Sequence, residues 1–173
     1  MESGADAPLR PYLSLSRTLD KVRPGGIIAF ITSKGTLDKE NPNVRKYIAQ
    51  RADLLGAIRL PNDTFKAAAG TEVTSDIIFL QKRDRLVDIE PDWVHLATDA
   101  NGIRMNAYFV DNPEMVLGDM QMVSGPHGME SACIAYENAE LGDLLRDAIQ
   151  NIHAEITEFE IDDLEAEDED LSI

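Results

Sequence analysis

Hydrophobic and polar positions follow two different periods along the first part of the chain. Apolar positions in residues 12–22 recur at three- and four-residue steps until Pro24, which predicts a short helix. A Pro-Gly-Gly turn at 24–26 then leads into residues 27–32, an apolar run too short for a helix, which predicts a strand buried on both faces. Such strands are typical of parallel α/β sheets covered by helices. We therefore expect an α/β sheet built outward from this strand.

A second helix and two further strands are predicted next. Asn41 and Pro42 favour a helix start, and Arg45 is expected on the solvent side of that helix. Residues 56–60 and 73–80 have the composition of strands. The connection between them is too short for a crossover helix, so these strands should be antiparallel. We expect the strand at 73–80 to lie between the other two.

The second half of the chain carries weaker patterns. Residues 92–96 and 104–110 are predicted strands joined by a hairpin turn at 99–102. Apolar residues at helical spacing predict a C-terminal helix over 138–159. The resulting division of the chain is a disordered lead at 1–11, an α/β half-domain at 12–85, satellite strands and loops at 86–137, the helix, and an acidic disordered tail at 160–173.

Charge is distributed unevenly along the 173 residues, whose net charge is −16. Residues 151–173 hold ten acids and no Lys or Arg, whereas residues 34–85 hold ten basic residues against seven acidic ones. A polyanionic partner should therefore meet the middle of the chain. No run approaches the roughly 18 apolar residues of a membrane span. A single cysteine, Cys133, fits a reducing compartment, and we expect a cytoplasmic protein with no membrane partner.

Catalytic and metal-binding patterns are missing from the sequence. Cys133 has no recognisable partner among the three histidines His95, His127 and His153, so we interpret it as an ordinary thiol. The methionines of the second half are not accompanied by a His or Cys cluster, and we expect them to fill gaps in the core. No metal site is predicted.

Three stretches resemble a known enzyme family. They are GGIIAFITSKG at 25–35, VRKYIAQRADLLGAIRLPNDTF at 44–65 and TEVTSDIIFLQKR at 71–83. Their order resembles the C-terminal half of an amino-methylating, adenine-specific DNA methyltransferase, in particular the methylase region of helicase–methylase fusion proteins of bacterial mobile elements. The resemblance spans about residues 12–157. It implies half of a Rossmann-like sheet, with two parallel strands, an antiparallel strand between them, flanking helices and a small α+β appendage.

The same family has two motifs that this chain does not contain. One is a Gly-rich turn that binds S-adenosylmethionine, and the other is an Asn/Asp/Ser-Pro-Pro-aromatic motif that holds the target adenine. Asn41-Pro42 is followed by neither a second proline nor an aromatic residue, and we interpret it as a helix cap. We therefore expect no catalytic or cofactor-binding residue in this chain and no cofactor bound by it. In the parent enzyme the cofactor would be S-adenosylmethionine.

One family site can be transferred by motif. Enzymes that modify a base extrude it from the duplex and stack it on aromatic side chains. The resemblance implies that Phe65, in LPNDTFKAAAG, has this role, and a small core anchor is the alternative for this residue. Lys34, Arg59 and Lys66 lie at or near the loop ends of the first two strands and are candidates for contacts to DNA phosphates. A solvated basic rim is the alternative for these three.

Two hypotheses of different class follow. The first is a fragment of a DNA adenine methyltransferase that contributes the target-base side and is inactive alone, with DNA and the missing N-terminal half as partners. The second is a non-catalytic protein-interaction module with an acidic C-terminus. Without upstream strands, the strand at 27–32 should leave one edge open, where a homo-oligomer can form.

Overall fold

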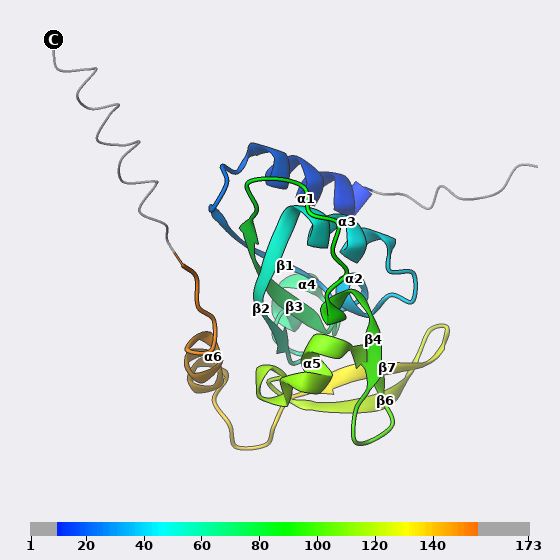
Figure 1. The fold of residues 1–173 in the computed structure, drawn as a ribbon. Coiled ribbons are helices and arrows are strands. Elements are labelled where there is room, and N and C mark those ends of the chain that lie inside the picture. Colours follow the sequence, from blue (N-terminus) through cyan, green and yellow to red (C-terminus); the bar gives the residue numbers. More distant parts are fainter. Residues whose placement is uncertain (1–9, 156–173) are drawn as a thin grey trace, which may run out of the picture.

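The structure is a computed structural model that describes residues 10–155 (Figure 1). The longer helices are α1 (Arg10–Lys21), α3 (Asn43–Arg51) and α6 (Leu141–Ile149). The short helical elements are α2 (Gly35–Asp38), α4 (Lys66–Ala69), η1 (Asp92–Val94), α5 (Ala107–Asp111) and η2 (Pro113–Met115). The strands are β1 (Ile27–Ser33), β2 (Ala52–Leu60), β3 (Ser75–Lys82), β4 (Leu96–Thr98), β5 (Arg104–Asn106), β6 (Asp119–Gly125) and β7 (Gly128–Ile134).

The central sheet has three strands in the order β1-β3-β2. β3 is antiparallel to both neighbours, so β1 and β2 run in the same direction on either side of it. This arrangement confirms the predicted position and direction of the strand at 73–80. The fold is thus a mixed α/β fold. The strand pairs of the described residues are antiparallel, and a parallel sheet like the one expected from residues 27–32 is not among them.

Strand β1 is covered on one face, which corrects the prediction that both faces are buried. Ile28 is 7% exposed, whereas Ile27 and Ile31 are 49% and 57% exposed. Alternate side chains of a strand point to opposite faces. The side chains of Ile27 and Ile31 therefore share a face that the described residues leave uncovered at β1, and β1 is also an edge strand there, paired with β3.

Helices α1 and α3 lie together against the sheet, at the top of Figure 1. Leu19 of α1 and Ile48 of α3 are buried in the shared core. The helix start at Asn41 is confirmed in part, because the Asn41 side chain accepts a hydrogen bond from Asn43 N at 3.0 Å. The expectation for Arg45 is wrong. Its side chain is buried, and its guanidinium donates to the carbonyls of Val94 at 2.7 Å and Thr36 at 3.3 Å.

The satellite region consists of two hairpins, β4–β5 and β6–β7, with α5 between them. The turn at 99–102 is present, with Gly102 at φ 82. The predicted strand at 104–110 is wrong beyond Asn106, because the Asn106 side chain accepts from Tyr108 N and starts helix α5. The segment after η2 docks at the free edge of β2, where Leu117 N donates to Arg59 O at 2.9 Å, while the first hairpin lies against α2.

Helix α6 ends at Ile149, ten residues before the predicted end at 159. The segment that follows runs along the β2 side of the sheet. A Cβ atom on Gly56 would lie 2.9 Å from Ile152 Cγ1, so the absence of a side chain at Gly56 permits this approach. The predictions for residues 1–9 and 156–173 lie outside the described residues. No helix among the described residues has the length and hydropathy needed to cross a membrane.

Candidate nucleic-acid interface

The loop end of the central sheet is where β1 and β2 end and β3 begins. Lys34 directly follows β1, and its backbone N–H donates to Thr74 O at 2.9 Å, just before β3. Between β2 and β3 the chain forms a loop over residues 61–74, whose ends are tied by Val73 N donating to Asn62 O at 3.0 Å. The loop is also tied to the satellite region, because Asn62 N donates to Cys133 O at 2.7 Å.

Phe65 sits at the start of the short helix α4 inside this loop. Its carbonyl accepts hydrogen bonds from Ala68 N and Ala69 N, and the helix ends at Gly70 in the left-handed conformation, with φ 72. Glycine tolerates this conformation without a steric penalty. The turn therefore fixes the position of Phe65 by backbone hydrogen bonds on both sides of it.

The side chain of Phe65 is half-buried and packs against the hydrophobic core. One part of the ring is thus an anchor for the loop, and another part is open to solvent. This placement lies between the two alternatives that the sequence left open. It gives Phe65 a packing role and leaves the side chain partly exposed at the loop end.

The two lysines of the loop end differ in their surroundings. Lys66 is exposed, and its Nζ pairs with Glu72 Oε1 at 3.1 Å, with side-chain exposures of 59% and 50%. An ion pair this exposed contributes little to stability, so it can open for another anion. Lys34 is half-buried, and its Nζ lies 3.3 Å from the Ser131 hydroxyl of β7. Both ammonium groups lie on the segments that border the loop end.

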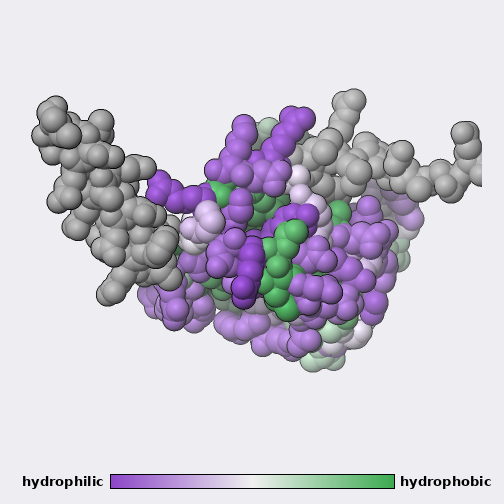
Figure 2. Space-filling view, turned by 45° about the horizontal axis from the view of Figure 1, so that its top comes forward, coloured by the Kyte–Doolittle hydropathy of each residue, from purple (hydrophilic) through white to green (hydrophobic). Residues whose placement is uncertain are grey.

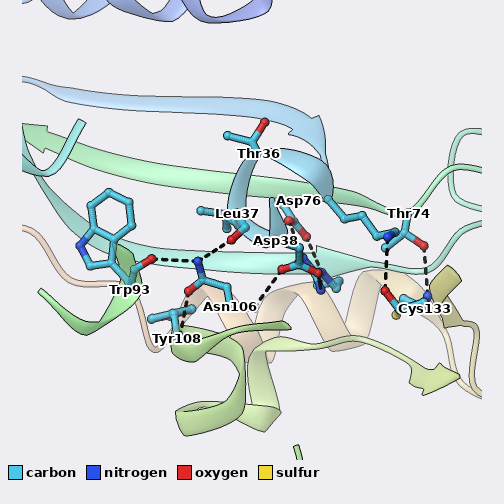
Figure 3. Close-up of polar contacts among 12 residues, drawn as sticks. Thr36, Leu37, Asp38, Thr74, Asp76, Trp93, Asn106, Tyr108 and Cys133 are labelled. Carbon is cyan, nitrogen blue, oxygen red and sulfur yellow. Dashed lines mark hydrogen bonds and ion pairs between the residues drawn. The ribbon is translucent and has the colours of Figure 1, made fainter. Parts of the chain in front are cut away.

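Arg59 is not part of this rim, which corrects the sequence prediction. Its side chain is 0% exposed and forms ion pairs with the carboxylates of Asp38 and Asp76, both of which are labelled in Figure 3. Arg59 donates to Asp76 from Nε at 2.8 Å and from Nη2 at 2.9 Å, and to Asp38 from Nη1 at 2.8 Å and from Nη2 at 3.0 Å. With its nitrogens occupied and its side chain buried, Arg59 has no surface to offer a DNA phosphate.

The surroundings of Arg59 keep it charged. Burial alone would lower the pKa of the Arg59 guanidinium, but the nearby Asp76 and Asp38 carboxylates outweigh burial and raise the pKa. The guanidinium also lies over the Phe109 ring, with 4.5 Å between Cζ and the ring centroid. An arginine fork that binds two carboxylates holds its partners in a fixed geometry. We therefore assign Arg59 a structural role: it ties β2, β3 and α2 together.

One buried polar residue, Asn106, extends this network, and another, Thr74, binds strand β7; neither was predicted as a site residue. The Asn106 side chain donates to Leu37 O and Trp93 O, both at 2.8 Å, and the Asn106 N–H donates to Asp38 (Figure 3). On the other side Thr74 Oγ1 accepts from Cys133 N at 3.0 Å. The only available signal for Asn106 was its suitability as a helix cap before residues 107–111.

Cys133 is fully buried on strand β7. Burial raises the pKa of its thiol to about 12. Because only the thiolate is a good nucleophile, this thiol is inert at neutral pH. The interpretation of Cys133 as an ordinary thiol agrees with its position.

The loop end thus combines a half-exposed aromatic ring, Phe65, with the two ammonium groups of Lys34 and Lys66. This set can hold a flat, negatively charged ligand by stacking and by charge, but it contains no nucleophile or proton-transfer pair. In the part of the chain that the structure describes, three or more His, Cys, Asp or Glu side chains do not gather in a group able to hold a metal ion.

Comparison with known proteins gives one similarity. The chain is 32% identical over 83 residues to the Defense against restriction protein B of Escherichia phage P1. The match covers 47% of this chain and 4% of that protein, so this chain corresponds to a small part of a much longer polypeptide there. No family model matches the chain. No solved structure matches it either.

Proposed function

We propose that this chain is a piece of a DNA adenine methyltransferase, the C-terminal part of its Rossmann-like domain. The parent enzyme transfers a methyl group from S-adenosylmethionine to an adenine amino group in DNA. This chain contributes the side that receives the target base and is inactive alone. A cytoplasmic location and an upstream half that carries the cofactor loop and the Pro-Pro-aromatic motif belong to the same proposal.

The order and direction of the central strands carry the proposal. The resemblance implies an antiparallel strand inserted between two strands of equal direction, and β3 lies in this way between β1 and β2. Beyond β1, the parent sheet would continue. The unpaired edge of β1 is what a strand has when its neighbour is missing, and the exposed side chains of Ile27 and Ile31 are what it has when the layer that packs on that face is missing.

The loop end supports the second part of the proposal. A base that has left the duplex is held by stacking on aromatic side chains. Phe65 is partly exposed in the loop that contains Lys66, and Lys34 follows the end of β1 at the same end of the sheet. In this role the ring would stack on the flipped adenine, while the two lysines neutralise flanking phosphates.

The similarity to the phage protein is compatible with this function. That protein is named for defence against restriction, and DNA methylation is one way in which DNA escapes restriction. Because the similarity covers only 83 residues, it supports a shared structural piece and leaves the activity of this chain to experiment.

The test uses the polypeptide encoded by the complete reading frame around this chain. An Asn/Asp/Ser-Pro-Pro-aromatic motif upstream is expected, and the purified protein should methylate adenine in DNA when it is supplied with S-adenosylmethionine. Base–aromatic stacking is worth about 1–3 kcal/mol by alanine substitution. Phe65→Ala should therefore lower methylation by roughly tenfold to a hundredfold, and Phe65→Trp should restore most of it.

A matched control separates stacking from packing. Phe79 is also a half-buried phenylalanine, but it lies within strand β3, and Phe79→Ala should lower the thermal midpoint without a specific loss of methylation. If methylation by Phe65→Ala falls only as far as its own drop in midpoint explains, the site assignment is wrong. If the complete protein has no adenine methylation activity, the proposed function itself is wrong.

A second candidate function is a non-catalytic protein-interaction module. The open edge of β1 favours it, because unpaired backbone groups next to exposed isoleucines form a surface for strand addition. Chromatography with light scattering distinguishes the two. Stable self-association of this chain through β1, together with no methylation by the complete protein, would favour the interaction module.

A further inference from the structure

A groove of about 420 Å³ lies at the opposite end of the central sheet from Phe65, where α1 and α3 end and β3 runs out into residues 83–86. The charged residues that line it are four cations and two acids, namely Arg51, Lys82, Arg83, Arg85, Asp20 and Asp84. We call this surface the basic groove. Figure 2 shows hydrophilic residues around a narrow hydrophobic strip on the face of the molecule that includes the top of Figure 1.

Two of the four cations are already held by neighbouring groups. Arg51 lies over the Tyr47 ring at 3.5 Å, and Arg83 pairs with Asp53 at 2.6 Å. Within residues 10–155, Lys82 and Arg85 form no ion pair. The groove thus offers two uncommitted positive charges in a protein whose net charge is −16.

The chain contains a segment of complementary charge. Residues 156–173 hold nine acidic residues and no Lys or Arg. Phe159, Ile161 and Leu164 are interspersed with the first of these acids. The rim of the groove has an apolar counterpart in Leu86, which is 67% exposed.

The described chain ends next to the groove. The Gln81 side chain donates to Glu155 O at 2.8 Å and to Gly25 O at 3.1 Å. Gly25 directly follows Pro24, which lines the groove, so Glu155 and the end of the groove meet through Gln81. An extended chain spans at most about 3.3–3.6 Å per residue. The first acids after Glu155 are therefore within reach of the cations at this end of the sheet.

We propose that the acidic segment at residues 158–170 binds in the basic groove of its own chain. Its carboxylates pair with Lys82 and Arg85, and its apolar residues cover Leu86. The hydrogen bond from Gln81 to Glu155 sets the position from which the segment starts. The inference does not depend on the proposed methyltransferase function.

Zero-length crosslinking of the full chain tests this contact. A carbodiimide joins a carboxylate to a lysine amine only when the two form a direct contact, and the product is mapped by mass spectrometry. We expect the carboxylates of residues 158–170 to couple to Lys82 in preference to Lys34, Lys39, Lys46 and Lys66. The Lys82 product should fall several-fold in 1 M salt, where the screening length is about 3 Å.

Two charge-reversal variants supply the matched comparison. Arg85→Glu removes an uncommitted cation from the groove and should lower the Lys82 product several-fold. Lys39→Glu makes the same change in net charge on an exposed residue outside the groove and should leave the product unchanged. Circular dichroism establishes that both variants are folded.

Three results would overturn the proposal. One is coupling spread evenly over all lysines, and another is a Lys82 product that neither salt nor Arg85→Glu reduces. The third comes from mixing isotopically heavy and light chains, since products that join a heavy chain to a light one would place the acidic segment in the groove of a second copy.

Discussion

The two edges of the central sheet have opposite environments, although the same strand, β3, pairs with both. Ile31 of β1 and Ile58 of β2 are both in register with Ile77, so they occupy the same row of the sheet. Ile58 is 0% exposed and Ile31 is 57% exposed. Identical side chains in one row thus differ almost completely in burial.

The difference comes from what docks on each edge. Beyond β2, the satellite region adds a hydrogen bond to the Arg59 carbonyl and the segment after α6 approaches Gly56. Beyond β1, no strand of the described chain continues the sheet. The comparison shows that the β2 edge is covered by other parts of this chain, while the described residues leave the β1 edge uncovered. The predictions below test the two edges separately.

The largest loss of stability is expected from Arg59→Met in strand β2. Methionine fills much of the same space but leaves the buried Asp76 and Asp38 carboxylates without their cation. Removing one partner of a buried ion pair costs about 3–5 kcal/mol. Urea unfolding followed by circular dichroism should show this loss in the free energy of unfolding.

Arg104→Met is the matched control for this substitution. Arg104 also binds a carboxylate with two nitrogens, at 2.6 and 3.2 Å from Glu40, but both partners are exposed. Exposed ion pairs contribute little, so no measurable change is expected. Equal effects of the two substitutions would contradict the structural role assigned to buried Arg59.

Asn106→Ala should have the next largest effect. The substitution removes the cap of α5 and leaves the carbonyls of Leu37 and Trp93 without a donor. A lost cap costs about 0.5–2 kcal/mol of stability, and an unsatisfied buried group costs about 1–3 kcal/mol. We therefore expect the free energy of unfolding to fall by about 2–4 kcal/mol in total. Amide hydrogen exchange should also show faster opening of α5 than of β3. Uniform acceleration of all amides would mean that Asn106 does not act locally.

Gly56→Ala tests the contact between β2 and the C-terminal segment. The added Cβ would lie 2.9 Å from Ile152 Cγ1 and 3.0 Å from the Tyr108 hydroxyl. Overpacking costs about 1–3 kcal/mol of stability. We expect the free energy of unfolding to fall by about 1–2 kcal/mol, because Ile152 lies near the end of the described chain and can shift. Chain cleavage by a protease after residue 150 should become faster in the variant. An unchanged cleavage rate would show that this segment is not seated on Gly56.

The sequence predicted the arrangement of the central strands because that arrangement depends on local features. The turn before residue 27, the strand compositions and the short connection before β3 were each readable without tertiary information. Phe65, Lys34 and Lys66 lie at the loop end, because they directly follow strand ends or occupy the loop itself, and their roles in binding stay predictions.

Burial of charged residues could not be predicted in the same way. Arg45 and Arg59 are both fully buried, and their partners are 9 to 49 residues distant in sequence, among them the carbonyl of Val94 and the carboxylates of Asp38 and Asp76. A hydrophobicity pattern treats any arginine as a solvent-facing residue, although a paired arginine is compatible with burial. The exposure of Ile27 and Ile31 was not predicted, because an apolar run does not show whether another part of the protein packs over it.

The smallest loss of stability is expected for a substitution at the β1 edge. Comparing it with the same substitution in β2 distinguishes the two edges directly. Ile→Val in a core costs about 0.5–1.5 kcal/mol, so Ile58→Val should lower the free energy of unfolding by about that amount. Ile31→Val removes the same methyl group from the same row, but from an exposed position, where substitutions usually stay within about 0.5 kcal/mol. Repeating both substitutions in the complete reading frame extends the test. If an upstream segment packs over this face of β1 there, Ile31→Val should become as costly as Ile58→Val. If the cost of Ile31→Val stays near zero in the longer protein, no upstream segment covers this face of β1.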